Sequence, residues 1–151
     1  MISARLKELG LELPQPAKPL ASYVPARKSG DLIFISGQLP LENGALMMTG
    51  PMTGERSLEE AQEAMARCFL NGLAAATLES PLDGIREVIR LGAFVASVPE
   101  FTDQHLIANG ASNLAQEIFG KAGKHARAAV GVPCLPLNAT VELEILFRVA
   151  S

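Results

Sequence analysis

The stretch Ala139-Thr140-Val141-Glu142-Leu143-Glu144-Ile145-Leu146-Phe147-Arg148-Val149 decides the fold class of this chain. Apolar residues occupy every second position from Val141 to Val149, and polar residues fill most of the positions between them. Strict alternation is typical of a β-strand that buries one face and exposes the other. The stretch therefore predicts a half-buried strand whose exposed face carries Glu142.

Four segments upstream of this strand are also rich in apolar and β-branched residues and stop close to a glycine or a proline, which predicts strands. These segments are residues 23–28, 32–35, 88–97 and 126–132. Pro25 interrupts the first segment and predicts an edge strand or a bulge there. Asn43-Gly44 is a strong hairpin signal, so residues 45–48 are expected to form a return strand.

Two long helices are expected between these strands. Ser57 and Glu60 have the spacing of a capping box, and apolar residues recur at helical spacing from there to about Leu78. A second helical region covers residues 103–120 and can break at Gly110.

The N-terminus predicts a short helix over residues 3–9, which Ser3 caps and Gly10 ends. The prolines that follow keep the chain extended as far as Pro19. We therefore divide the chain into an N-terminal helix and arm, residues 1–20, and one domain, residues 21–151.

The order of these elements predicts an α+β fold in which two helices cover one face of a mostly antiparallel sheet, similar to a split βαβ layout. The other face of the sheet is left open, and it carries polar side chains such as Glu142. An open sheet face is usually covered by a partner subunit. The pattern therefore predicts self-association through this face.

The composition narrows the class of protein. The chain has 151 residues, of which 48% are hydrophobic and 19% charged, as in one globular domain with one core. Its formal net charge is −3, and phosphate backbones attract basic surfaces, so the balance argues against a nucleic-acid ligand. Two cysteines, Cys68 and Cys134, are too few for a disulfide framework and indicate free thiols in a reducing compartment.

The sequence contains neither a secretory signal pattern nor an apolar run approaching the roughly 20 residues that span a bilayer. The expected location is the cytoplasm. The HExxH, CxxC, GxGxxG and P-loop patterns are also absent, and the two histidines, His105 and His125, belong to no cluster of metal ligands. These absences leave zinc-protease, thioredoxin-type redox, dinucleotide-binding and P-loop chemistry without support, and the case for a metal site is poor.

Arg127 and Glu142 are the candidate functional pair. If residues 126–132 and 139–149 pair antiparallel about the loop 133–138, Arg127 falls opposite Glu142. Such a pair can be a cross-strand ion pair, which contributes about 0.2–1 kcal/mol. That is the interpretation the pattern alone favours, and the alternative is a substrate site, in which the guanidinium holds a carboxylate in bidentate fashion and the glutamate positions a water molecule.

Two smaller signals accompany this pair. Ser36-Gly37 follows an apolar strand directly, and a glycine there permits either an ordinary strand end or a close approach of a ligand to the backbone. Tyr23 is the only tyrosine of the chain, and on its own it is typical of a packing residue with a hydrogen-bonded hydroxyl.

Taken together, these residues resemble the Rid family, the YjgF-type reactive intermediate deaminases, also labelled endoribonuclease L-PSP or translation inhibitor. The resemblance covers nearly the whole chain from Tyr23 onward. Its strongest parts are the block Ser36-Gly37-Gln38-Leu39-Pro40 with the strand before it, and Arg127 followed by Leu135-Pro136 and Val141-Glu142.

The resemblance implies a chorismate-mutase-like fold and a homotrimer with clefts between subunits. It implies hydrolysis of small enamine or imine acids to 2-keto acids and ammonia, without a cofactor. Arg127 would hold the substrate carboxylate, Glu142 would orient or activate the attacking water, and Tyr23, Ser36 and Gly37 would line the cleft. The expected partners are small imine, enamine or 2-keto acids and further copies of the chain.

Some positions depart from the family pattern. His125 stands where a proline is frequent, Ala129 replaces a common cysteine, and the segment before Arg127 is longer than usual. Members also line the cleft with an asparagine, a position for which Asn109 and Asn113 compete. Two other functions therefore stay open, a non-catalytic trimeric module that binds small carboxylates or acts like a chaperone, and an endoribonuclease.

Overall fold

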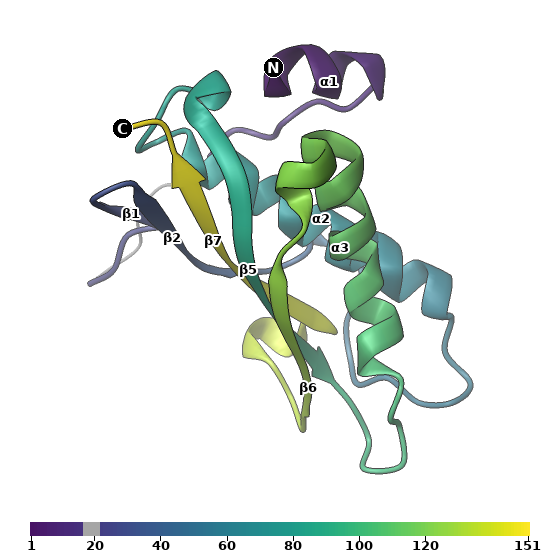
Figure 1. Ribbon diagram of the computed structural model, residues 1–151. Coiled ribbons are helices and arrows are strands. Elements are labelled where there is room, and N and C mark those ends of the chain that lie inside the picture. The colour runs from purple at the N-terminus through teal and green to yellow at the C-terminus, as the bar shows by residue number, and fades with distance from the viewer. Residues whose placement is uncertain (17–21) are drawn as a thin grey trace.

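The computed structural model describes residues 1–16 and 22–151. Figure 1 colours the helices and strands in chain order. The helices are α1 (Ile2–Glu8), α2 (Leu58–Ala76) and α3 (Gln104–Phe119), with short 3-10 turns η1 (Leu82–Gly84), η2 (Gly120–Gly123) and η3 (Pro136–Asn138). The strands are β1 (Ala26–Ser29), β2 (Leu32–Gln38), β3 (Leu41–Glu42), β4 (Ala45–Leu46), β5 (Ile85–Ala96), β6 (Ala126–Val132) and β7 (Val141–Val149).

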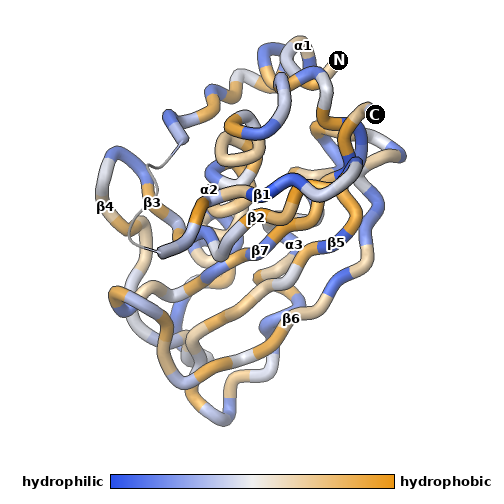
Figure 2. Tube along the Cα trace, turned by 90° about the vertical axis from the view of Figure 1, so that its left-hand side faces the viewer, coloured by the Kyte–Doolittle hydropathy of each residue, from blue (hydrophilic) through white to orange (hydrophobic). Residues whose placement is uncertain are grey.

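Five strands form one sheet in the order β1-β2-β7-β5-β6, and every neighbouring pair is antiparallel except β5 and β6. Helices α2 and α3 pack on one side of this sheet (Figure 1), and Figure 2 looks onto the opposite, uncovered side. The α+β class, the mostly antiparallel sheet and the placement of both helices on one face are therefore confirmed.

The alternation in β7 places its apolar side chains against the helices, as the sequence predicts. Val141, Leu143 and Phe147 are fully buried in the core. Phe147 forms edge and stacked contacts with Phe69 and Phe119, with ring centroids 6.0 Å apart in each pair. Such aromatic pairs contribute about 0.5–1.5 kcal/mol beyond the burial of their area.

Close approach of α2 to α3 depends on Gly110. A Cβ atom there would lie 2.7 Å from the backbone carbonyl carbon of Gln62, so a side chain has no room. Gln62 Nε2 also donates to the Leu106 carbonyl at 2.8 Å across the same contact. The expected break at Gly110 does not occur, because α3 is continuous and the glycine serves this packing.

Two local signals are confirmed. The Glu60 N–H donates to the Ser57 hydroxyl at 3.2 Å and caps α2. Asn43 and Gly44 adopt positive φ values of 53° and 82°, as a tight hairpin turn requires, although strands β3 and β4 are short and form a separate two-stranded sheet.

The predicted hairpin between residues 126–132 and 139–149 is wrong, because β5 lies between β6 and β7 in the sheet. Strand β6 instead pairs in parallel with β5, since α3 carries the chain back in a β5-α3-β6 crossover. Arg127 is aligned with Leu91, whereas Glu142 is aligned with Phe94. The two candidate residues are therefore not cross-strand neighbours.

At the N-terminus, α1 begins at Ile2, and the predicted Ser3 cap is wrong. The Ser3 hydroxyl and backbone N–H instead donate to the Asp83 carboxylate, at 2.6 and 2.9 Å, which holds the pKa of Asp83 below its usual value. Ile2 and Leu6 join the main core. The predicted boundary at residue 20 lies outside the described residues.

The strand that was expected from Tyr23 begins at Ala26.

Cys68 is fully buried, and burial, followed by the charge of Glu142, raises the pKa of its thiol well above the ordinary value. Both cysteines are free, and Cys134 is exposed. In residues 1–16 and 22–151, no helix is long and apolar enough to cross a bilayer.

Candidate functional site

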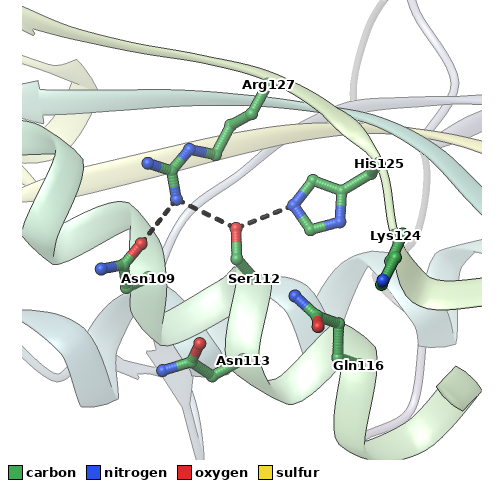
Figure 3. Close-up of a pocket in the computed structure, with 7 residues that line it drawn as sticks. All are labelled: Asn109, Ser112, Asn113, Gln116, Lys124, His125 and Arg127. Atoms are coloured by element: carbon green, nitrogen blue, oxygen red, sulfur yellow. Dashed lines mark hydrogen bonds between the residues drawn. The ribbon is translucent and has the colours of Figure 1, made fainter. Parts of the chain in front are cut away.

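Arg127 reaches from the edge strand β6 to helix α3. Its register partner Leu91 is fully buried on the helix side of the sheet, and the Arg127 side chain leaves β6 on that same side. Its Nη1 donates to Asn109 Oδ1 at 2.8 Å and to Ser112 Oγ at 3.1 Å (Figure 3). Its Nη2 donates to the His105 carbonyl at 3.3 Å. Three acceptors on one helix therefore fix the guanidinium.

These contacts leave part of the guanidinium free. Of its five N–H donors, the Nε–H and one Nη2–H have no acceptor among residues 1–16 and 22–151. These two donors lie side by side and form the fork that matches a carboxylate. Arg127 is exposed and forms no ion pair with any described residue, so its charge is available to an anion.

A hollow of about 440 Å³ opens beside Arg127 and helix α3, and we call it the Arg127 hollow. Its lining includes two cationic side chains, Arg127 and Lys124, and no acidic residue. Its complete lining is Asn109, Ser112, Asn113, Gln116, Lys124, His125 and Arg127 (Figure 3). Cationic and amide N–H groups without a carboxylate favour a small anionic ligand.

Both candidate asparagines line the hollow, but they have different surroundings. Asn109 accepts a hydrogen bond from Arg127 and so helps to orient the guanidinium. Asn113 lies one helical turn further along α3 on the same wall, and Figure 3 shows its amide away from Arg127. Asn113 is therefore the asparagine whose amide can contact a ligand without releasing Arg127.

Ser112 and His125 form a hydrogen-bonded pair that sequence reasoning missed. Ser112 Oγ lies 2.8 Å from His125 Nε2, and His125 Nδ1 lies 2.6 Å from the Gly123 carbonyl oxygen. A carbonyl oxygen only accepts, so Nδ1 carries a proton and Nε2 faces the hydroxyl. The available signal was a serine on the otherwise apolar buried side of α3, which also contains Ala108, Ala111 and Ala115.

Glu142 belongs to the other face of the sheet. Its neighbours Val141 and Leu143 are fully buried on the helix side, so Glu142 points toward the uncovered side. Its carboxyl group lies over Gly37, where a Cβ atom would come within 2.9 Å of Glu142 Cδ. Half-burial, and then the nearby charge of Glu144, raise the pKa of Glu142 above its ordinary value.

Ser36 ties this region to the segment that contains Tyr23. The Ser36 hydroxyl donates to the Val24 carbonyl at 2.6 Å, and its N–H donates to the Pro25 carbonyl at 2.9 Å. Ser36 and Gly37 form a bulge between Ile35 and Gln38 in the pairing of β2 with β7. Tyr23 itself is 61% exposed, so its ring is not a packing residue within this chain.

The predicted site residues thus fall into two groups. Ser36, Gly37 and Glu142 lie together on the uncovered face, with Tyr23 in the segment bonded to them. Arg127 lies with α3 on the other side of the sheet. Within residues 1–16 and 22–151, no group of three or more His, Cys, Asp or Glu side chains could hold a metal ion.

Comparison with known proteins identifies the family. Residues 3–149 match the model of the family described as "YjgF/chorismate_mutase-like, putative endoribonuclease". Protein TCP17 of Trypanosoma cruzi is 40% identical over 147 residues, which are 96% of this chain and 92% of that protein. The chain therefore belongs to the YjgF (Rid) family, and its fold is the YjgF/chorismate-mutase-like fold.

Two further relatives bear on fold and function. A crystal structure of a protein of unknown function from Agrobacterium tumefaciens is 47% identical, with a TM-score of 0.87 over 98% of this chain and 91% of that one. A protein of Dermatophagoides farinae named 2-iminobutanoate/2-iminopropanoate deaminase is 28% identical over 135 residues, 89% of this chain and 91% of that protein. The family thus contains a named imine deaminase.

Proposed function

We propose that this protein hydrolyses small imine and enamine acids to 2-keto acids and ammonia, in the cytoplasm and without a cofactor. The reaction would take place in clefts between the subunits of a homotrimer. The observation that carries the proposal is the free fork of Arg127, which is fixed by three acceptors and neutralised by no carboxylate of the described chain. The named deaminase among the relatives supports the same chemistry.

Two copies of the chain are needed to complete such a site. A carboxylate bound at Arg127 lies on the helix side of the sheet, whereas Glu142 lies on the uncovered side. A second copy can resolve this separation if its uncovered face, with Glu142 and Gly37, packs against the β6 edge of the first. The uncovered face exposes Phe34 by 51% and Val130 by 44%, and such packing would bury them.

The chemistry requires orientation and a base. An imine carbon is already electrophilic, so a clamp on the substrate carboxylate and a positioned water molecule suffice. Glu142 would accept a proton from that water, and its raised pKa makes it a stronger base than an ordinary glutamate. General acid–base assistance of this kind contributes about 10²–10⁴-fold.

The test supplies 2-aminoacrylate from a pyridoxal-phosphate lyase and follows the formation of the keto acid above the rate without added protein. We expect wild type to accelerate this step, Arg127→Ala to lose about 10²-fold in kcat/KM, and Glu142→Gln to lose about 10²–10⁴-fold. Arg86→Ala is the matched control, because Arg86 is exposed and forms no ion pair among the described residues.

Equal rates for wild type and Arg127→Ala would overturn the proposal. Saturable pyruvate binding without turnover would instead support a non-catalytic carboxylate-binding module. Cleavage of single-stranded RNA that Arg127→Ala abolishes would support an endoribonuclease.

A further inference from the structure

The side chains that line the Arg127 hollow differ in whether their hydrogen-bonding groups already have partners. Arg127 Nη1 donates both of its protons, one to Asn109 Oδ1 and one to Ser112 Oγ (Figure 3). The two ring nitrogens of His125 have the Ser112 hydroxyl and the Gly123 carbonyl as partners. These groups bind one another, so they fix one wall of the hollow and offer little to a ligand.

The other three lining residues, Asn113, Gln116 and Lys124, form what we call the rim of the hollow. Within residues 1–16 and 22–151, their side chains form no ion pair, and none of them joins the hydrogen bonds of the first wall. Figure 3 shows them on the side of the hollow away from the Arg127 guanidinium. An ammonium group has three N–H donors and each amide has two, so the rim presents a set of free donors.

The charge around the rim favours an anion. Lys124 and Arg127 line the hollow, and Lys121 on the adjoining turn η2 adds a further positive charge nearby. Glu117 is the acidic residue of α3, and it is exposed and does not line the hollow. A concave surface with one sign of charge concentrates ligands of the opposite sign.

The rim is separate from the fork that the proposed function uses. The Nε–H and the free Nη2–H of Arg127 lie on the edge of the guanidinium opposite Nη1, and Nη1 is the nitrogen bound to Asn109 and Ser112 at the hollow. A carboxylate on the fork and an anion at the rim would therefore contact different N–H groups. Both can be bound at the same time.

The donors of the rim suit a phosphate group better than a carboxylate. A planar carboxylate matches a guanidinium fork, whereas an ammonium group binds phosphate as a point charge. A phosphate group offers three strong acceptor oxygens, one each for Lys124, Asn113 and Gln116. The hollow measures about 440 Å³, within the range of small-molecule sites, which leaves room for an organic group attached to the phosphate.

We propose that the rim of the Arg127 hollow is a second binding site, which takes the phosphate group of a small phosphate monoester or of free phosphate. The site does not depend on the proposed hydrolysis, because its occupation is measured without turnover. It is coupled to the fork through charge, since a phosphate at the rim offsets part of the attraction of Arg127 for a carboxylate. Such coupling is reciprocal between the two ligands.

The test is calorimetric titration of the protein with inorganic phosphate and with glycerol 3-phosphate, at constant pH and at constant ionic strength set by chloride. Wild type should bind saturably, and Lys124→Gln should weaken binding about 10-fold or more. Asn113→Ala and Gln116→Ala should each weaken it about 3-fold. Tighter binding of glycerol 3-phosphate would identify an ester as the ligand, and tighter binding of phosphate would identify the free anion.

Lys121→Gln is the matched control, because it removes the same charge from an exposed lysine that does not line the hollow, and it should bind like wild type. Equal weakening by Lys121→Gln and Lys124→Gln would overturn the inference, because general attraction would then explain the binding. The absence of saturable binding of either phosphate ligand would overturn it as well and would leave the proposed function standing.

Pyruvate separates the two sites. Arg127→Ala should lose pyruvate binding, whereas Lys124→Gln should keep it. Saturating phosphate should weaken pyruvate binding to wild type about 5-fold, and pyruvate should weaken phosphate binding by the same factor. Phosphate binding that is abolished by Arg127→Ala and unchanged in Lys124→Gln would place the anion on the fork and overturn the second site.

Discussion

The division of the site between two copies of the chain can be tested by mixing two inactive proteins. Arg127→Ala keeps Glu142, and Glu142→Gln keeps Arg127. In the closed ring proposed above, each cleft would take Arg127 from one subunit and Glu142 from the next. A cleft is therefore intact when its first subunit is the Glu142→Gln protein and its second is the Arg127→Ala protein.

The expected magnitude follows from this geometry. In an equal mixture with random assembly, each of the two conditions has a chance of one half, so about one quarter of all clefts are intact. The value does not depend on the number of subunits in the ring. Each variant alone should retain about 1% of wild-type activity or less, so recovery to about 25% is a large signal.

The assay refolds the two variants together from denaturant and measures keto-acid formation from 2-aminoacrylate. The same proteins refolded separately and then mixed provide the baseline, and wild type taken through the same procedure gives the scale. Activity that stays at the level of the separate variants would refute the shared cleft, because a site built within one chain cannot be restored by mixing. A wild-type protein that runs as a single subunit would refute it as well.

Three further outcomes follow from close contacts and charge. Gly37→Ala would push a methyl group against the Glu142 carboxyl, 2.9 Å from its Cδ, so kcat should fall about 10-fold or more with little change in Tm, and normal turnover would contradict this. Glu142→Gln should raise Tm at pH 7, because burial and then Glu144 raise the pKa of Glu142 and its charged form disfavours folding. The gap should close as the pH falls toward the ordinary value of 4.5, and a gap independent of pH would argue against this cause. Gly110→Ala should cost about 1–3 kcal/mol in denaturant unfolding, since its Cβ would overlap the Gln62 backbone, whereas a neutral change would show that α2 and α3 can separate freely.

Local signals in the sequence predict most elements of this fold. The Ser57 cap, the Asn43-Gly44 turn and the alternation of β7 each depend on residues close together in the chain, and each is confirmed. Strand pairing depends on distant residues, and there the hairpin between β6 and β7 was predicted wrongly. A strand, a helix and a strand in succession, β5-α3-β6, favour parallel neighbours, and that pattern was available in the sequence.

The site was predictable in part for the same reason. Glu142 and the Ser36-Gly37 bulge come together through the adjacent strands β2 and β7. The groups that bind Arg127 lie on α3. No local pattern in the sequence fixes the rotation of this helix about its axis to within one residue. Ser112 and His125 therefore appeared only in the structure, where their side chains lie 2.8 Å apart.

Helix α3 divides its residues between two tasks by their position around the helix. Ile107, Ala111 and Ala115 hold the helix on the core, while Asn113 and Gln116 face the Arg127 hollow. Ligand preference can therefore be redesigned at positions 113 and 116 without touching the residues on which folding depends. Protein engineering could therefore vary the face of α3 that lines the hollow while the face that packs on the core keeps its sequence.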